Sequence, residues 1–436
     1  MGEYDFKNFF KNPTHIHRLN VLATGLTAES RFNVMAWLDM VLLGKTMPKI
    51  LHIIPSLNCG GVEKSLLDIY PFLSKKLHHL ICPFLHAGEL YTGTVNLEKS
   101  KNNGFWLYIF KSHTLVAKIL KPLLFFYYTY RTQQFLKNEN PDIVITYTDV
   151  SAFVLVFISV FTNQKRKFKW YARIDSHIIP ANGNPFFLNK KFIYRIVSGT
   201  VRFMTKCFVE RADCIITVSH ALMNEVITTC HADAKKFFLL SNSISSNSAL
   251  SDYPFENDHF FVAAGRLEHV KGFDFLINTF SIFSKNNPKV KLIIFGDGSR
   301  RKSLQKLIKS LHLAEKILLP GFIKNPSEIS SKAIATIVPS RSEAFGKIIV
   351  EVMQTLSIVI ASNCGGPREI ITDNINGLLF ECENTAALLD AMNRVMQMSD
   401  QTKLTIKNNA YQKSLEYTPE RVSALLNAKL EMDLVL

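Results

Sequence analysis

The sequence predicts an α/β fold that is built from two Rossmann-like domains. The chain has 436 residues, which is enough for two domains of ordinary size. Each half opens with an apolar strand, a glycine-containing loop and a helix, first from residue 50 and again from residue 260. This order is the first unit of a Rossmann-like sheet. Residues 245–257 are polar and rich in turn-forming residues, so they predict the hinge between the domains.

Composition and charge narrow the class of protein. Hydrophobic residues make up 47% of the chain and charged residues 20%, which is typical of a globular protein. The net charge of +15 favours an acidic partner such as a phosphate compound or an anionic membrane surface. The seven cysteines are scattered and form no Cys-x-x-Cys motif, which argues against a disulfide framework or a zinc site. Without a secretory signal or an apolar run of about 18 residues, a cytoplasmic protein is expected.

The first part of the chain combines an extension with the start of a domain. Residues 1–46 have weak periodicity and fit an appended helix, an unordered tail or a mis-assigned start. The strand at residues 50–54 leads to Gly60, Gly61 and a helix. Because this loop is not Gly-x-Gly-x-x-Gly, no dinucleotide site is expected. The paired glycines either form a tight turn or let the backbone approach a ligand closely.

Two polar side chains follow a strand later in the first half. A helix is expected at residues 115–138, a strand at 143–147, an apolar helix at 152–161 and a strand at 168–174. Asp175 and His177 come directly after the last of these. In open α/β sheets, ligands bind at the carboxyl ends of the strands, so both side chains are candidates for catalysis. The alternative for His177 is a structural histidine.

Residues 165–211 carry eleven basic residues against two acidic ones. If residues 190–211 form one helix, four cations share a face opposite an apolar face: Lys191, Arg195, Arg202 and Lys206. Such a helix either packs on the core with a solvated basic face or docks on anionic lipid headgroups. A nucleic-acid partner is not expected, because no basic-aromatic binding motif is present.

The second half repeats alternating strands and helices. Further strands of the first half are expected at residues 214–218 and 237–240. The second half is expected to contain strands at 260–264, 291–295, 317–319, 335–338, 358–361 and 376–380, and helices at 273–283, 346–356 and 385–398.

A glycine-bounded loop after the strand at 260–264 carries two cations. Arg266 and Lys271 lie in Gly265-Arg-Leu-x4-Lys-Gly272. An arginine offers a planar fork to a diphosphate, and a lysine offers a point charge. These cations can offset the charge of a leaving diphosphate. Since Glu268 and Asp297 belong to no Asp-x-Asp pair, no metal cofactor is expected.

Two carboxylates flank the start of the helix at 346–356. Glu343 precedes the helix, and Glu351 lies on it. The first amides of a helix favour an anion such as a phosphate, here those of Phe345, Gly346 and Lys347. Carboxylates accept hydrogen bonds from vicinal hydroxyls, so the layout matches a sugar nucleotide. The alternative is a core helix with two solvated glutamates.

This Glu-x7-Glu pattern with Phe-Gly inside, together with the Gly-Arg-Leu-x4-Lys-Gly loop, closely resembles the signature of the retaining GT-B glycosyltransferases of the family-4 type (glycosyl transferases group 1). The resemblance implies an acceptor-binding domain at residues 47–244 and a donor-binding domain at 245–415. A C-terminal helix at 416–436 would cross back toward the first domain. Asn242 lies in a segment that resembles the family's Asn-Gly-Ile-Asp linker, with Ser243 and Ser245 in place of glycine and aspartate.

The resemblance also implies roles for individual residues. Glu343 would contact the hydroxyls of the donor sugar, Glu351 the ribose, and the loop with Phe322 and Ile323 would run past the base. A histidine of the family lies near the reacting carbon, and either Asp175 or His177 could take its place. The candidate catalytic residues are Asp175, His177, Arg266, Lys271 and Glu343. The candidate donor-binding residues are Gly60, Gly61, Gly265, Arg266, Lys271, Phe322, Ile323, Glu343, Ala344, Phe345, Gly346, Lys347 and Glu351.

The predicted protein is a retaining glycosyltransferase that moves a hexose-type unit from a nucleoside diphosphate sugar to an acceptor hydroxyl. A saccharide or lipid-linked acceptor in polysaccharide, lipopolysaccharide or glycolipid synthesis is expected. The protein would work in the cytoplasm or on the inner face of the membrane. Two alternatives are a non-catalytic partner that binds a sugar nucleotide or a membrane, and a sugar-nucleotide 2-epimerase on the same fold.

Overall fold

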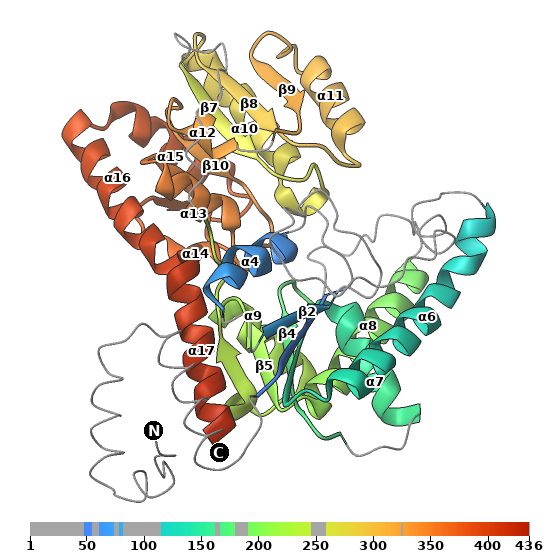
Figure 1. Cartoon of the computed structure of the whole chain (residues 1–436). Helices are drawn as coiled ribbons and strands as arrows, with labels where there is room; N and C mark the ends of the chain where they lie inside the picture. Colours follow the sequence, from blue (N-terminus) through green and yellow to red (C-terminus); the bar gives the residue numbers. More distant parts are fainter. Residues whose placement is uncertain are drawn as a thin grey trace, which may run out of the picture.

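A computed structural model describes residues 48–54, 61–73, 78–81, 115–161, 166–178, 191–245, 259–323 and 326–435. The predicted extension (residues 1–46), Gly60 and residues 246–257 of the predicted hinge lie outside these ranges. Side chains of the long helices α6 and α8, bounded below, are described from residues 125 and 199 onward. Figure 1 shows two α/β domains, one above the other.

The first domain contains a sheet of six parallel strands in the order β2-β1-β3-β4-β5-β6. Strand β3 is fully buried, as expected for a strand covered by helices on both faces. The chain leaves β1 in one direction and later returns on its other side, so the strand order reverses between β1 and β3. The strands are β1 (Ile50–Ile53), β2 (His78–Ile81), β3 (Ile143–Tyr147), β4 (Lys169–Ile174), β5 (Cys214–Thr217) and β6 (Phe237–Leu239).

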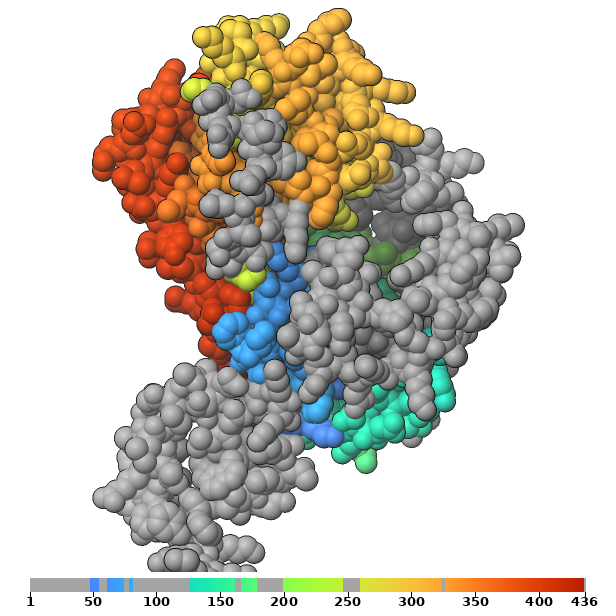
Figure 2. Space-filling view, turned by 45° about the horizontal axis from the view of Figure 1, so that its top comes forward, coloured from blue at the N-terminus to red at the C-terminus, as the bar shows by residue number. Residues whose placement is uncertain are grey.

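Helices cover both faces of this sheet. Helices α6, α7 and α8 pack side by side on one face (Figure 1). On the other face, α4 packs against the C-terminal helix α17, whose surfaces adjoin in Figure 2 in blue and red. The helices are α4 (Gly61–Ile69), α6 (Leu115–Glu139), α7 (Asp149–Phe161), α8 (Lys191–Arg211), α9 (His220–Cys230) and α17 (Pro419–Val435), with short 3-10 helices at Tyr70–Phe72 and Ala234–Lys236.

The second domain repeats this architecture with a parallel sheet in the order β12-β11-β10-β7-β8-β9. Its strands are β7 (Phe260–Ala264), β8 (Lys291–Phe295), β9 (Ile317–Gly321), β10 (Thr336–Val338), β11 (Val359–Ser362) and β12 (Leu378–Phe380). Its helices are α10 (Phe273–Asn286), α11 (Arg301–Ser310), α12 (Pro326–Ser330), α13 (Lys347–Gln354), α14 (Pro367–Ile370), α15 (Thr385–Gln397) and α16 (Asp400–Ser414), with 3-10 helices at His269–Lys271 and Leu415–Tyr417. Two such sheets confirm the predicted fold class.

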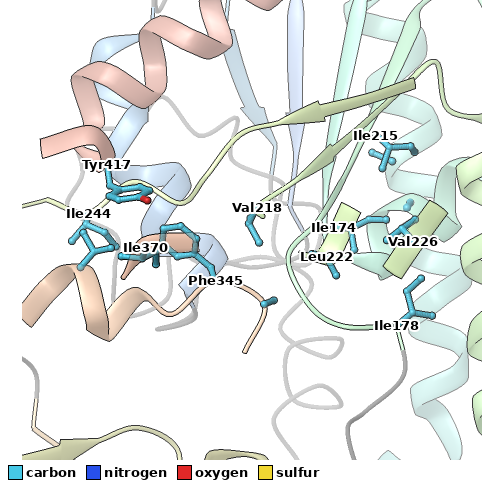
Figure 3. Close-up of a cluster of buried hydrophobic side chains, with 14 of the residues drawn as sticks. Ile174, Ile178, Ile215, Val218, Leu222, Val226, Ile244, Phe345, Ile370 and Tyr417 are labelled. Atoms are coloured by element: carbon cyan, nitrogen blue, oxygen red, sulfur yellow. The ribbon is translucent and has the colours of Figure 1, made fainter. Parts of the chain in front are cut away.

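A shared apolar cluster joins the two domains. Val218 and Leu222 of the first domain belong to the same buried cluster as Phe345 and Ile370 of the second (Figure 3). The ring of Phe345 meets that of Tyr417 edge to face, with centroids 5.4 Å apart. This packing brings the carboxyl ends of the two sheets toward each other, which is where ligands bind in such sheets.

Glu369 of α14 adds a polar contact between the domains. It accepts hydrogen bonds from the backbone amides of His220 (2.9 Å) and Ala221 (2.7 Å) at the start of α9. A carboxylate at a helix N-terminus satisfies unpaired amides and complements the helix dipole. Within the described part of the chain, none of the helices combines the length and the hydropathy that a membrane crossing requires.

Candidate active site

A cavity of about 650 Å³ lies between the two domains. It opens at the carboxyl ends of strands from both sheets, so its wall combines residues that are far apart in the sequence. The first domain contributes Gly61, Val62, Thr148, Asp149, Asp175, Ser176 and Asn242. The second contributes Ala264, Gly265, Arg266, Lys271, Phe295, Gly296, Asp297, Phe322, Ile323, Pro326, Glu343, Phe345, Gly346, Lys347, Ile348 and Glu351.

The loop with Arg266 and Lys271 is fixed against the segment that carries Glu343. Gly272 has φ 67°, and a Cβ at this position would lie 2.0 Å from the carbonyl oxygen of Pro339. Only glycine allows this close approach. The amide of Arg341 also donates to the carbonyl of Val270 at 2.8 Å. The two segments therefore reach the cavity wall together.

Lys271 and Glu343 form an ion pair in the cavity wall. The lysine Nζ donates to Glu343 Oε2, which also accepts from Ser340 Oγ at 3.3 Å. Their side chains are 22% and 15% exposed, so the pair is mostly shielded from water. Arg266 is exposed beside them. The structure thus places two cations and a carboxylate at one end of the cavity.

Helix α13 begins at the cavity, one residue later than predicted. Its N-cap is Gly346, with φ 102° and ψ 53°, a conformation that favours glycine. The first amides of α13 carry the positive end of the helix dipole. Glu351 lies one turn further on, and its Oε1 is 3.6 Å from Nζ of Lys64 in α4. In this structure, a lysine accompanies each of the two signature glutamates.

The side chain of Lys347 spans the cavity. Its Nζ donates a hydrogen bond to the carbonyl oxygen of Gly61 at 3.0 Å. Burial lowers the pKa of Lys347 to about 8, although the carboxylates of Glu351 and Asp68 oppose this shift. Sequence reasoning assigned only the amide of Lys347 to the site, whereas its side chain links the two domains.

Asp175 and His177 take different positions. Asp175 lines the cavity, and its Oδ1 accepts a hydrogen bond from Arg173 Nε at 2.9 Å. His177 is absent from the cavity wall and pairs through Nδ1 with Glu225, whose other oxygen accepts from the amide of Ile178 at 2.9 Å. Burial lowers the pKa of His177, but the hydrogen bond and charge of Glu225 outweigh it, so the pKa is raised.

The remaining predicted residues are divided between the wall and the core. Gly61, Gly265, Phe322, Ile323, Phe345 and Gly346 line the cavity. The side chain of Phe322 is 73% exposed, so it offers a free aromatic surface at the rim. Ala344 is buried in the shared apolar cluster and does not line the cavity.

Sequence reasoning missed Thr148, Asp149, Arg173 and Asn242. Thr148 and Asp149 directly follow β3, so the rule that singled out Asp175 after β4 could have found them. Thr148 has φ 80°, a strained conformation for a β-branched residue. Burial and the nearby carboxylate of Asp175 raise the pKa of Asp149. Arg173 lies inside β4, and no motif or spacing in the sequence distinguishes it from the other basic residues nearby.

A larger cavity of about 810 Å³ lies at the opposite edge of the first sheet, near the amino ends of β3 and β4. None of the predicted site residues lines it. Its wall contains Gln133, Leu136, Lys137, Asn140, Pro141, Leu155, Ile158, Ser159, Arg166, Lys167, Phe168, Trp170 and Arg211. Among the residues described, no group of three or more His, Cys, Asp or Glu side chains is placed to hold a metal ion.

Comparisons with known proteins agree with this arrangement. Residues 251–413 match the family described as Glycosyl transferases group 1. A Campylobacter jejuni protein is 25% identical over 372 residues, which cover 84% of this chain and 94% of that protein. It is named N-acetylgalactosamine-N,N'-diacetylbacillosaminyl-diphospho-undecaprenol 4-alpha-N-acetylgalactosaminyltransferase.

Solved structures share the two-domain fold. The crystal structure of Anabaena HepE in complex with UDP and glucose has a TM-score of 0.64 at 19% identity, covering 88% of this chain and 100% of that chain. Sucrose-phosphate synthase from Thermosynechococcus elongatus has a TM-score of 0.70 at 16% identity, covering 89% of this chain and 99% of that chain. At these identities, the likeness shows the fold.

Proposed function

Because the chain belongs to the glycosyl transferases group 1 family, which consists of retaining, nucleotide-sugar-dependent glycosyltransferases of the GT-B fold, we propose that it transfers a hexose-type unit to an acceptor hydroxyl. The donor in this proposal is a nucleoside diphosphate sugar, and the product keeps the anomeric configuration. The acceptor belongs to the synthesis of a cell-surface polysaccharide, lipopolysaccharide or glycolipid.

One observation supports this proposal above the others. Arg266, Lys271 and the amino end of α13 meet in the wall of one cavity with Glu343 and Glu351. Two cations and a helix N-terminus suit a diphosphate. The two carboxylates suit hydroxyls on either side of it. We assign Glu343 to the donor sugar and Glu351 to the ribose.

The proposed reaction takes place on one face of the donor sugar. The bond between the anomeric carbon and the diphosphate oxygen breaks, while the acceptor oxygen forms a new bond to that carbon. The leaving phosphate oxygen accepts the proton of the acceptor hydroxyl. Arg266, Lys271 and the amides at the start of α13 stabilise the charge that develops on the diphosphate. The residues' own contribution is therefore mainly positioning and electrostatics.

The pairing of Lys271 with Glu343 has a consequence for donor binding. Without a donor, the ammonium neutralises the carboxylate and keeps both side chains at the cavity wall. A bound diphosphate would place a second anion beside the same ammonium. Lys271 then bridges the carboxylate and the phosphate, which orients the donor sugar over Glu343.

The first domain would bind the acceptor. Asp175 is our candidate for contact with the acceptor hydroxyl, because it lines the cavity opposite the cations. His177 would act through packing, since Glu225 holds its ring and its Nε2 is near Gly365. The name of the Campylobacter relative describes a diphospho-undecaprenol-linked substrate, which supports a lipid-linked acceptor.

The basic helix supports docking at an anionic membrane. Arg202 and Lys206 are exposed on α8, and Phe203 between them is 68% exposed. Each basic residue near an anionic membrane contributes about 1 kcal/mol, and an aromatic ring can enter the interface. The side chains of Lys191 and Arg195 lie outside the described residues.

A donor screen tests the proposed function. Purified protein is incubated with UDP-glucose, UDP-galactose, UDP-N-acetylgalactosamine, UDP-N-acetylglucosamine and GDP-mannose, with and without phosphatidylglycerol vesicles. We expect one donor to release its nucleoside diphosphate. When undecaprenyl-linked or membrane-extracted acceptors are supplied, we expect a glycoside product with the anomeric configuration of the donor. Failure of every donor to bind in calorimetry would overturn the proposal. An isomerised sugar without a glycoside would favour the epimerase.

A further inference from the structure

Arg173 near the carboxyl end of β4 holds two polar side chains of the cavity wall. Its side chain is 2% exposed. Nε donates to Asp175 Oδ1 at 2.9 Å, and Nη2 donates to Asn242 Oδ1 at 3.1 Å. The guanidinium lies 5.9 Å from the ring centroid of Tyr147, which supports it from the neighbouring strand. A buried and rigid fork therefore fixes Asp175 and Asn242 together.

These bonds determine which atoms stay available. Asp175 uses Oδ1 for Arg173, and its Oδ2 is buried with no hydrogen-bond partner among the described residues. The Asp175 side chain is 9% exposed. Because the amide oxygen of Asn242 accepts from the guanidinium, its NH2 group points elsewhere, and no described residue accepts a hydrogen bond from it. Among the described residues, one acceptor and one donor without a partner thus belong to two residues that line the same cavity.

An unpaired carboxylate oxygen costs free energy in a folded protein, so it indicates a place for a ligand. Thr148, another residue of the cavity wall, gives an independent indication. It lines the cavity with φ 80°, and its Oγ1 is also without a partner among the described residues. Backbone strain of this kind persists at ligand sites.

We propose that Arg173 is a positioning residue that presents Asp175 Oδ2 and the Asn242 NH2 group to one hydroxyl of a neutral sugar ring in the acceptor. A hydroxyl donates one hydrogen bond and accepts others, so it matches an acceptor and a donor held side by side. Arg266 and Lys271 belong to the opposite domain, and this places the pair on the acceptor side. The inference rests on the proposed function and adds the chemistry of the acceptor group.

Charge favours a neutral hydroxyl over a phosphate group at this position. Asp149 and Asp175 both line this wall, and burial together with Asp175 raises the pKa of Asp149. A phosphate would be a third anionic group beside these two carboxylates and would meet repulsion, whereas a hydroxyl would not. An acceptor with a diphosphate linker must therefore extend that linker away from Asp149 and Asp175.

The test uses isosteric variants of the full chain. Asp175→Asn removes the charge, Asn242→Asp removes the donor, and Arg173→Lys removes the fork while retaining the charge. Asp213→Asn is the matched control, since Asp213 pairs with Arg166 at 2.6 Å near the amino end of β4, away from the cavity. Saturation-transfer NMR measures binding of the methyl α-glycosides of glucose, galactose, mannose and N-acetylgalactosamine in the presence of saturating UDP.

We expect wild-type protein and Asp213→Asn to bind at least one of these glycosides. Binding weakens by about tenfold or more in Asp175→Asn and Asn242→Asp, and also in Arg173→Lys. The Kd for UDP stays unchanged in all variants that keep the wild-type Tm. This split between glycoside and UDP distinguishes positioning of the acceptor from a general structural role.

Two results would overturn the inference and leave the proposed function standing. One is unchanged glycoside binding in Asp175→Asn and Asn242→Asp. The other is wild-type protein that binds UDP but none of the glycosides. Parallel loss of UDP and glycoside binding in correctly folded variants would also count against it. Failure of the wild-type protein to bind UDP and every sugar nucleotide would instead overturn the proposed function.

Discussion

Lys347 Nζ in the second domain donates a hydrogen bond to the carbonyl oxygen of Gly61 in the first domain at 3.0 Å. The residue that opens α13 is thus tied to the residue that opens α4. Lys64 and Glu351 form a second link one turn further along both helices. The helix that we assign to the donor therefore also contacts the first domain, so donor binding would involve residues that link the two domains.

This link predicts a pH-dependent stability. Burial lowers the pKa of Lys347 to about 8 from 10.5, so between these values the unfolded chain binds a proton that the folded chain does not. The stability of the wild type must therefore rise with pH in this window, relative to Lys347→Met. Melting temperatures between pH about 7.5 and 10 measure the difference. Lys332→Met, a change at an exposed position, should show the same pH dependence as the wild type. A difference in Tm between the wild type and Lys347→Met that stays constant with pH would contradict the prediction.

Removing the two cations should impair turnover. Arg266→Ala combined with Lys271→Ala leaves the leaving diphosphate without two charges that stabilise it. We expect kcat/KM to fall by at least about tenfold, equal to ~1.4 kcal/mol of transition-state stabilisation. Steady-state release of nucleoside diphosphate measures it. Lys332→Ala is the control, and a smaller loss in the double variant would show that another group carries the diphosphate.

Substitutions of Glu351 and Lys64 should differ in their effects on the affinity for UDP. The pair is 3.6 Å apart and its side chains are 31% (Lys64) and 21% (Glu351) exposed, so the ion pair itself contributes little. Glu351→Gln removes the negative charge and one of the two oxygens that would accept from the ribose hydroxyls, and should raise the Kd for UDP by about tenfold. Lys64→Met should change that Kd by less than about threefold. Calorimetry decides between them; equal effects would mean that the lysine itself binds the nucleotide.

Two buried histidines should make the first domain sensitive to acid. His52 Nε2 lies 2.8 Å from His78 Nδ1, and its Nδ1 lies 3.0 Å from the hydroxyl of Tyr147. Burial lowers the pKa of His52 to about 3 and that of His78 well below its ordinary value. Below pH about 6.5, the unfolded chain therefore binds more protons than the folded chain. The free energy of unfolding decreases as the pH is lowered through this range.

The size of this effect follows from the linkage relation. Between pH about 6.5 and 5, each histidine can remove up to about 2 kcal/mol from the free energy of unfolding. Replacing both, as in His52→Gln with His78→Gln, should flatten this dependence in urea titrations at several pH values. His312→Asn changes an exposed histidine and should keep the wild-type slope. An unchanged slope in the double variant would exclude the pair as the cause.

The sequence predicted the sheets and the cavity residues of the second domain better than those of the first domain, for a physical reason. Arg266, Lys271, Glu343 and Glu351 lie in short segments beside strands and helices, so local spacing placed them. Strand β2 was not predicted, because it contains His78 and His79 among only two apolar residues. His78 is nevertheless buried, since it pairs with His52. A pairing between distant strands leaves no local pattern.

The cavity wall that we assign to the acceptor depends on contacts over long sequence separations. Arg173 and Asn242 are 69 positions apart, and only the fold brings the guanidinium against the amide. Arg173 is one of many basic residues in this part of the sequence. Its burial within β4 could therefore not be predicted from the sequence. Asp175 was found because it ends a strand. The different positions of Asp175 and His177 could not be predicted from the sequence: Asp175 lines the cavity, whereas His177 pairs with Glu225.

If α8 docks on the membrane, its exposed residues should contribute more to lipid binding than cations elsewhere on the surface. A triple variant tests this by removing two exposed cations and an aromatic side chain that is 68% exposed. It combines Arg202→Glu, Lys206→Glu and Phe203→Ser. Binding to phosphatidylglycerol vesicles should weaken by more than about tenfold, because about 1 kcal/mol is lost per cation and an apolar anchor disappears. Sedimentation with vesicles measures it. Helix α16 provides the control, because two lysines and an exposed apolar residue occur there at the same spacing. The control variant combines Lys403→Glu, Lys407→Glu and Leu404→Ser, and Leu404 is 52% exposed. Equal loss in both triple variants would mean that net charge, rather than α8, directs the protein to the lipid surface.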